Sequence, residues 1–249
     1  RGLGDVYKRQ AGHKRIPVII HESDMTPGLA NKIAMRSATK ICCNFPETVK
    51  CLPENKAVLT GTPIRQELLS GDAREGLKFC GFNAAKPVIL VIGGSLGSVA
   101  VNHAVRSILP ELLKDFQVIH LCGKDKLDAS LNGTEGYVQF EYIKDELPDL
   151  FAAADLIISR AGANAICEIS ALAKPNILIP LSANASRGDQ ILNARSFERQ
   201  GYSKVLEEES VNAQTLQSAI REVYENRQTQ SRSGDCRAYS TFQCSSRCR

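Results

Sequence analysis

The stretch PVILVIGGSLGSVAVN, residues 87–102, decides the fold. A short apolar run ends in two glycines, a serine and a third glycine, and the residues that follow have a helical pattern. A continuous apolar run bounded by glycines is typical of a strand that is buried on both faces of a parallel sheet. The stretch therefore predicts a strand, a sharp glycine turn and a helix, which together form the repeating unit of an α/β protein.

The same alternation occurs on both sides of this stretch. Before it lie apolar runs at 16–21, 39–44 and 57–61 and a helical pattern at 27–38. After it, apolar runs at 117–123, 137–143, 156–160 and 176–181 alternate with helical patterns as far as about residue 225. We therefore expect residues 86–228 to form one complete, doubly wound, Rossmann-like domain with a parallel sheet. Residues 11–61 hold too few strands for such a domain and predict the C-terminal part of a second one.

Three segments fall outside this alternation. Residues 62–85 are polar and contain several glycines, which predicts a linker with short helices. Residues 1–10 form an extension before the first apolar run. Residues 229–249 have almost no aliphatic side chains and no helical period, so we expect a disordered tail.

Charge and cysteine usage narrow the function classes. The net charge of +4 comes from the two ends of the chain, so the part between them is slightly acidic and offers no basic surplus for nucleic acid. No apolar run approaches the roughly 18 residues that a membrane span needs. The nine cysteines match no zinc-binding spacing, and we expect those in apolar or helical segments to be buried free thiols.

The role of Ser95 has several alternatives. The string G-G-S-L-G fits the nucleophile elbow of a serine hydrolase, but that class needs a histidine late in the chain. None of the four histidines lies after His120, which argues against a hydrolase. The dinucleotide fingerprint fits poorly because the glycines are spaced G-G-x-x-G, and a P-loop is excluded because no G-K-[ST] follows.

We favour a phosphate-binding turn at this position. Gly94 and its neighbour Gly93 allow a sharp turn, and Gly97 allows a ligand to approach closely. The free amide groups at the helix start, together with the hydroxyl of Ser95, would hold a phosphate. The alternative is a glycine turn that binds nothing.

A second strand, glycine turn and helix occur in LIISRAGANAICEIS, residues 156–170. Both turns lie at the carboxyl ends of parallel strands, where open α/β sheets bind their ligands. Glu168 follows Gly162 by six residues and carries a carboxylate suited to the two vicinal hydroxyls of a ribose. The alternative for Glu168 is a solvated side chain on a helix face.

Five separated motifs resemble one family. They are HESDMTPGLANKIA at 21–34, GTPIR at 61–65, GGSLGSVAVN at 93–102, SRAGANAICEISALAKPNILIPL at 159–181 and DQILNA at 189–194. In this order they resemble the MurG family of UDP-N-acetylglucosamine transferases, which completes lipid II in peptidoglycan synthesis. The resemblance covers residues 11 to about 228. It implies the GT-B arrangement, in which two Rossmann-like domains face each other across a cleft.

The resemblance also implies the substrate-binding residues. These are Asp24, Arg65, Gly94, Ser95, Gly97, Ile143, Ala163, Asn164, Ala165, Ile166, Cys167, Glu168, Asp189 and Gln190. In the family pattern the loop at Ser95 holds the UDP phosphates, Ile143 presents its backbone to uracil, and residues 163–168 line the nucleotide with Glu168 on the ribose. Gln190 binds the sugar hydroxyls with help from Asp189.

The remaining implied contacts lie nearer the N-terminus. Arg65 is placed near the donor at the domain junction. His21, Glu22 and Asp24 line the cleft from the N-terminal side, and Asp24 stands where many members of the family have asparagine.

The resemblance implies an inverting transfer of N-acetylglucosamine from UDP-N-acetylglucosamine to lipid I, the undecaprenyl-pyrophosphoryl muramoyl peptide. Helix-end amides would stabilise the departing UDP while a base deprotonates the acceptor hydroxyl. No D-x-D motif occurs, and we expect neither a metal nor a cofactor. The implied location is peripheral, on the cytoplasmic side of the bacterial plasma membrane, with other cell-wall synthesis proteins as further partners.

This sequence departs from the family at both ends. The family's glycine-rich GGTGGH loop, which supplies the base, does not occur, and residues 1–10 and 229–249 do not resemble the family. We therefore expect an N-terminally truncated, donor-binding fragment with little turnover, in which His21 and Glu22 are weak candidates for the base. The alternatives are another UDP-sugar enzyme of GT-B or epimerase type, and a non-catalytic nucleotide-binding module.

Overall fold

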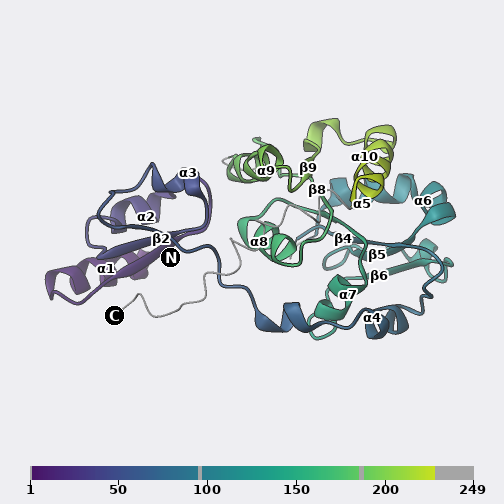
Figure 1. Ribbon diagram of the computed structural model, residues 1–249, viewed down its shortest axis with the longest axis horizontal. Helices are drawn as coiled ribbons and strands as arrows, with labels where there is room; N and C mark the ends of the chain where they lie inside the picture. The colour runs from purple at the N-terminus through teal and green to yellow at the C-terminus, as the bar shows by residue number, and fades with distance from the viewer. Residues whose placement is uncertain (1, 95–96, 185–187, 228–249) are drawn as a thin grey trace. The chain divides into compact units, whose positions relative to one another are not determined.

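A computed structural model describes residues 2–94, 97–184 and 188–227 (Figure 1). The chain divides after Pro63 into two compact units, and each is described by itself. Ser95, one of the predicted site residues, lies outside the described residues.

The second unit is built on a six-stranded, wholly parallel sheet. Its strands are β4 (Val88–Ile92), β5 (Gln117–Leu121), β6 (Tyr137–Phe140), β7 (Leu156–Ser159), β8 (Asn176–Leu178) and β9 (Lys204–Val205). Their order across the sheet is β6-β5-β4-β7-β8-β9, so the chain winds outward in one direction from β4 and then in the other from β7. This order is that of a doubly wound Rossmann fold, which confirms the predicted fold class.

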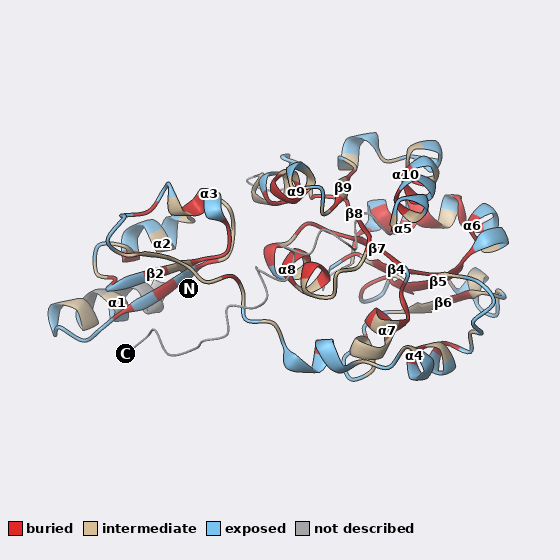
Figure 2. Ribbon diagram, in the orientation of Figure 1, coloured by how far each residue is buried: buried red, intermediate tan, exposed pale blue. Residues whose placement is uncertain are grey.

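Helices cover both faces of this sheet. They are η1 (Gln66–Ser70), α4 (Ala73–Cys80), α5 (Val99–Ser107), α6 (Leu109–Asp115), η2 (Ala129–Leu131), α7 (Leu147–Ala153), α8 (Ala163–Ala171), α9 (Asp189–Arg199), η3 (Glu208–Ser210) and α10 (Ala213–Glu225). Along β4, Ile89 and Val91 pack with α5, α6 and α10, whereas Val88 and Leu90 pack with α7 and η1. The strand is buried on both faces (Figure 2), which explains its continuous apolar run.

The long helix expected after the first glycine turn is two helices. α5 ends at Ser107 and α6 begins at Leu109, with Ile108 between them at φ −111° and ψ 5°. Pro110 stands in the first turn of α6, where it needs no amide hydrogen. In a continuous helix its ring would clash with the carbonyl four residues earlier, so the helix breaks before it.

Residues 62–85, predicted as a linker with short helices, contain the short helices η1 and α4, and both are packed within the second unit. η1 and α4 lie against α7, and the amide of Asp72 donates to Asp149 Oδ1 at 2.7 Å. A β-carbon on Gly71 would lie 2.1 Å from the carbonyl oxygen of Pro148, and one on Gly76 would lie 2.4 Å from that of Asp149. These glycines allow close packing, whereas the sequence pattern alone predicts that they interrupt the short helices of a linker.

The first unit holds a three-stranded parallel sheet in the order β1-β2-β3. Its elements are α1 (Gly2–His13), β1 (Ile19–Glu22), α2 (Leu29–Ala34), β2 (Lys40–Cys43), α3 (Pro46–Val49) and β3 (Ala57–Leu59). The three expected strands are present, and α1 is an additional helix in a segment for which no structure was predicted. Its residue Ala11 packs on the small core around Ile20 and Ile41. No helix in the described ranges of the chain is long and apolar enough to cross a membrane.

Candidate functional site

The two predicted glycine turns lie side by side in the second unit. The first follows β4 and leads into α5, and the second follows β7 and leads into α8. β4 and β7 are neighbours in the sheet, at the point where the winding direction reverses. α5 packs on one face of the sheet and α8 on the other. Doubly wound sheets bind their ligands at this switch point, outside the carboxyl ends of the strands.

The first glycine turn, residues 93–97, contains three glycines whose positions disfavour a side chain. Gly94 and Gly97 have φ values of 86° and 69°, in the left-handed region. A β-carbon on Gly97 would lie 2.0 Å from the carbonyl oxygen of Cys122, and one on Gly93 would lie 2.6 Å from the amide nitrogen of Ser98. The amide of Gly97 donates to the carbonyl of Gly94 at 2.9 Å. These contacts fold the backbone tightly and bring the turn against the end of β5.

Ser98 joins the first turn to the second. Its hydroxyl caps α5 by accepting from the amide of Val101 at 3.2 Å. It also accepts from Arg160 Nη2 at 2.6 Å. Arg160 comes directly after β7 and donates through Nη1 to the carbonyls of Ile179 and Pro180, both at 3.2 Å. One guanidinium therefore ties together the carboxyl ends of β4, β7 and β8.

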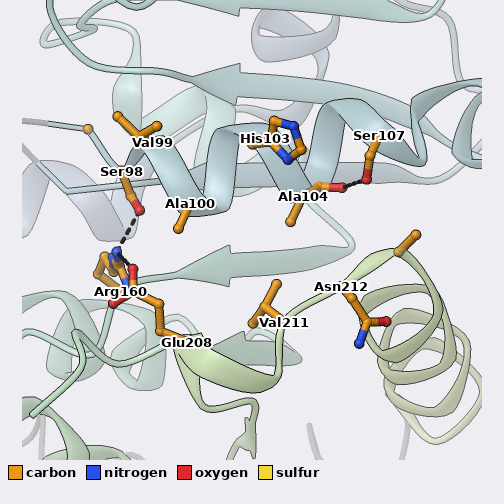
Figure 3. Close-up of a pocket in the computed structure, with 12 residues that line it drawn as sticks. Ser98, Val99, Ala100, His103, Ala104, Ser107, Arg160, Glu208, Val211 and Asn212 are labelled. Carbon is orange, nitrogen blue, oxygen red and sulfur yellow. Dashed lines mark hydrogen bonds and ion pairs between the residues drawn. The ribbon is translucent and has the colours of Figure 1, made fainter.

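Arg160 also forms an ion pair with Glu208, and Figure 3 shows this pair beside Ser98 at one end of a groove. The groove, of about 830 Å³, is lined by α5, η3 and the start of α10. Glu208 also accepts from the amide of Ser182 at 3.0 Å. Burial by itself would raise the pKa of Glu208, but the hydrogen bonds from Arg160 and Ser182 lower it below its usual range. The pair is therefore charged, although both side chains are largely buried.

The second glycine turn, residues 160–162, opens α8 without a side-chain cap. Gly162 is the N-cap residue, and the first amides of the helix follow at residues 163–165. Glu168 lies on the next turn and pairs with Arg65, whose Nη2 is 3.1 Å from Glu168 Oε1. The Arg65 side chain is 52% exposed, whereas that of Glu168 is 22% exposed. The structure thus brings these two predicted residues together.

The other predicted residues of α8 divide by burial. The side chains of Ala163, Ile166 and Cys167 are buried, and the amide of Ile166 already donates to the carbonyl of Gly162 at 3.0 Å. Asn164 is exposed and Ala165 is half-buried. Only the exposed side of the first turn therefore offers groups to a ligand.

Gln190 and Ile143 lie near the carboxyl ends of two separate strands, β8 and β6, with β5, β4 and β7 between them in the sheet. Gln190 Oε1 accepts from the amide of Leu181 at 3.0 Å, so the side-chain NH₂ group is the part that remains for a ligand. Asp189 is the first residue of α9, after Gly188 with φ 79°. Ile143 follows β6, and its side chain is in the core. This leaves the Ile143 backbone as the part that can contact a ligand.

Glu22 has a structural role in the first unit. It is buried, and its Oε2 accepts from the amide of Gly28 and from Asn31 Nδ2, both at 2.9 Å. Its Oε1 accepts from the amide of Asp24 at 3.3 Å. A carboxylate with three donors in one loop holds that loop in shape and is poorly placed to take a proton from a substrate.

His21 is exposed and makes one ring contact, from Nε2 to the carbonyl oxygen of Gly61 at 3.1 Å. A carbonyl only accepts hydrogen bonds, so Nε2 carries the hydrogen. The neutral ring then has its proton-accepting lone pair on Nδ1.

Three residues that connect this site to the core were missed in the sequence. Arg160 stands inside the quoted SRAGANA string, but it was read only as part of a turn. Asn102 and His120 are both buried and hydrogen-bonded to each other. A polar residue in the middle of an apolar strand such as QVIHL is the signal that could have identified His120.

Residues 88–244 match the glycosyltransferase family 28 C-terminal domain. Among solved structures, MurG of Acinetobacter baumannii has a TM-score of 0.73 with 26% identity, over 94% of this chain and 65% of that one. A structure titled putative UDP-N-acetylglucosamine 2-epimerase from Listeria monocytogenes has a TM-score of 0.68 over 94% of this chain and 68% of that one. Its 11% identity shows a shared fold alone.

Curated relatives are more similar in sequence. A protein of Lachnospira eligens, named UDP-N-acetylglucosamine–N-acetylmuramyl-(pentapeptide) pyrophosphoryl-undecaprenol N-acetylglucosamine transferase, is 72% identical over 217 residues. A protein of Lachnoclostridium phytofermentans with the same name is 64% identical over 219 residues. The matches cover 87% and 88% of this chain but 61% and 62% of the relatives. The chain thus spans about three fifths of the length of these relatives.

Proposed function

We propose that this chain, which belongs to glycosyltransferase family 28, binds UDP-N-acetylglucosamine at the carboxyl edge of its six-stranded sheet. The observation that carries the proposal is the pair of glycine turns on the neighbouring strands β4 and β7. Each turn opens a helix at the same edge, so the amino ends of two helices converge where the chain reverses its winding. An anionic diphosphate suits such a position.

Glu168 supports the nucleotide part of this proposal. Its carboxylate lies one and a half turns into α8, close enough to the second glycine turn to accept both hydroxyls of a ribose. Arg65 donates to one of the two carboxylate oxygens. When the donor binds, this half-exposed cation is free to turn toward the phosphates, while Glu168 receives the ribose.

The proposed reaction is that printed in the names of the relatives. N-acetylglucosamine leaves UDP and joins a hydroxyl of the undecaprenyl-pyrophosphoryl muramoyl peptide, lipid I, with inversion at the sugar carbon. The helix-start amides at residues 163–165 and at the start of α5 stabilise the charge on departing UDP. These amides take the part that a metal plays in other transferases, so the proposal needs neither a metal nor a cofactor.

The acceptor side of the proposal rests on the relatives alone. Lipid I would be met peripherally at the cytoplasmic face of the plasma membrane, where further cell-wall synthesis proteins act. His21, through Nδ1, is the better of the two candidate bases within this chain, since Glu22 is fully engaged in its own loop. Donor binding is the part of the proposal that the described residues support.

Calorimetric titration tests the donor site directly. The chain is titrated with UDP-N-acetylglucosamine, UDP-glucose, UDP and NADH, and the titrations are repeated with Glu168→Ala. Glu111→Ala serves as the matched control, because Glu111 forms a comparable surface ion pair on α6, next to the amino end of β5.

We expect selective binding of UDP-N-acetylglucosamine that weakens at least about tenfold in Glu168→Ala, equivalent to about 1.4 kcal/mol, and is unchanged in the control. Equal affinity for UDP-glucose would favour another UDP-sugar enzyme. Equal affinity for UDP with no effect of the sugar would favour a binding module. No binding by the folded chain would reject the donor site.

A further inference from the structure

The buried side of α5 carries a stripe of polar residues, of which only Ser98, the N-cap of the helix, has a role described above. Ser98, Asn102 and Arg106 are spaced four residues apart and so lie on one face of the helix. Ser98 and Asn102 are 5% and 2% exposed. Buried polar side chains are costly unless each one is hydrogen-bonded, so the partners of this stripe indicate what it holds.

Asn102 lies at the centre of a chain of hydrogen bonds. Its Nδ2 donates to the carbonyl oxygen of Cys122 at 2.9 Å. Because Nδ2 is the donor, the other polar atom of this side chain, Oδ1, can only accept. Oδ1 lies 3.0 Å from His120 Nε2. His120 Nε2 therefore carries the hydrogen, and Nδ1 accepts from the hydroxyl of Tyr137 at 3.1 Å.

These hydrogen bonds all run in one direction. Tyr137 donates to His120, His120 donates to Asn102, and Asn102 donates to the Cys122 carbonyl. Every member is neutral: burial, reinforced by the charge of Arg106, lowers the pKa of His120 to about 3, and burial raises the pKa of Tyr137 to about 12. The chain of donors therefore keeps one arrangement throughout the physiological pH range.

The end of this chain is in contact with the first glycine turn. The Cys122 carbonyl oxygen lies only 2.0 Å from the position that a β-carbon on Gly97 would take. No side chain fits there. Gly97 in turn donates its amide to Gly94. The position of one carbonyl thus limits where the backbone of Gly97 can lie.

Arg106 holds the same segment from the next turn of α5. Its Nη2 donates to the carbonyl of Lys126 at 2.7 Å and to Gln139 Oε1 at 3.1 Å. It also approaches Cys122 Sγ at 3.4 Å. The loop that follows β5 is therefore fixed to α5 at two successive positions of the stripe.

We propose that Asn102, oriented by His120 and Tyr137, is a positioning residue that sets the first glycine turn for a diphosphate through the Cys122 carbonyl. This inference rests on the proposed donor site and adds the residues that shape it. None of the three touches the ligand. Their effect is expected on the affinity for the phosphates and not on the affinity for the nucleoside.

The test compares UDP with uridine by calorimetry in Asn102→Asp. Aspartate keeps the size of the side chain but cannot donate to the Cys122 carbonyl. Asn176→Asp is the matched control: Asn176 is also buried, and its Nδ2 also donates to backbone carbonyls, those of Lys174 and Tyr202, at 3.0 and 3.1 Å. It lies at the amino end of β8, at the opposite edge of the sheet from the turns.

We expect Asn102→Asp to weaken UDP binding at least tenfold and uridine binding less than threefold, whereas Asn176→Asp changes the ratio of the two affinities less than twofold. Equal losses for UDP and uridine, or an unchanged ratio, would overturn the positioning role. No UDP binding by the unchanged chain would instead overturn the proposed function, and this inference with it.

Tyr137→Phe provides a second variant should Asn102→Asp fail to fold. It removes the hydroxyl that begins the series of hydrogen bonds leading to Asn102. We expect UDP binding to weaken two- to fivefold with uridine binding unchanged. Nitrogen NMR of His120 is the independent readout. A proton on Nε2 and none on Nδ1 at neutral pH is the expected result, and a proton on Nδ1 would overturn the direction of the chain.

Discussion

The two glycine turns serve neighbouring strands, yet they are held in different ways. The first is enclosed at Gly97 and Ser98: the Ser98 hydroxyl caps its helix, Arg160 donates to that hydroxyl, and the Cys122 carbonyl packs against Gly97. The second is open: α8 has no side-chain cap, and its Glu168 pairs only with the exposed Arg65. A fixed backbone suits the binding of phosphates. A carboxylate that can exchange its arginine partner for ribose hydroxyls suits reversible binding of the nucleoside.

Arg160→Met should show the largest difference between the turns. The substitution leaves the largely buried Glu208 without its cation and Ser98 without its donor. We expect the free energy of unfolding in urea to fall by about 3–5 kcal/mol. A loss below 1 kcal/mol would mean that the enclosed turn does not depend on this guanidinium.

Substitution of one glycine in each turn gives the next largest contrast. Gly97→Ala requires a left-handed alanine against the Cys122 carbonyl, and we expect a loss of about 1–3 kcal/mol together with a clear loss of UDP affinity. Gly162→Ala meets no atom within 4 Å and has φ −66°, so its unfolding free energy should change by less than about 1 kcal/mol. If the two variants lost similar free energies of unfolding in urea, the two turns would not differ in how tightly they are held.

The neutral hydrogen-bonded chain behind the first turn predicts a pH dependence. His120 has a pKa lowered to about 3 when folded, so below its unfolded value of 6.5 the unfolded chain binds a proton that the folded chain does not. Stability is therefore complete above about pH 6.5 and is lost as the pH falls toward 3. Between pH 6.5 and 5.5 this loss is about 1 kcal/mol.

Urea unfolding across this pH range checks the sign. His120→Gln should show a shallower fall in stability with falling pH, whatever its stability at neutral pH. The exposed His103 provides the control, and His103→Gln should leave the slope as it is. A slope that His120→Gln does not change would contradict a buried neutral ring.

Arg65→Ala should have the smallest effect on folding. The pair with Glu168 is half-exposed and screened by water, so we expect a change of less than about 1 kcal/mol, smaller still in high salt. The measurement is urea unfolding at low and high salt. A loss above 2 kcal/mol would show that the second turn is as firmly held as the first.

The sequence predicts the central part of the fold well because its signals are local. Continuous apolar runs followed by glycines identify β4 and β7 and place both turns at one edge of the sheet. The break at Ile108 was missed, although Pro110 is the residue that causes it. The packing of 62–85 was missed because a glycine that admits a neighbouring backbone looks the same as one that ends a helix.

The site itself was predictable only in part. Glu168 follows its glycine turn in the sequence, and Arg65 was expected nearby through the family resemblance. Asn102 is hydrogen-bonded to His120 of β5, and His120 to Tyr137 of β6; these residues are well separated along the sequence, and no local pattern brings them together. Long-range hydrogen bonds between buried polar groups depend on strand order, which a reading of single segments does not supply.

The winding order of the second unit also predicts how its amides exchange with solvent hydrogen. β4 is flanked by β5 and β7 and has three consecutive residues, Ile89 to Val91, with no exposed surface. β9 is a two-residue strand at the edge. The amides of β4 should therefore exchange only when the whole unit opens, whereas those of β9 exchange through local fraying. The first glycine turn begins at the end of the slowest-exchanging strand.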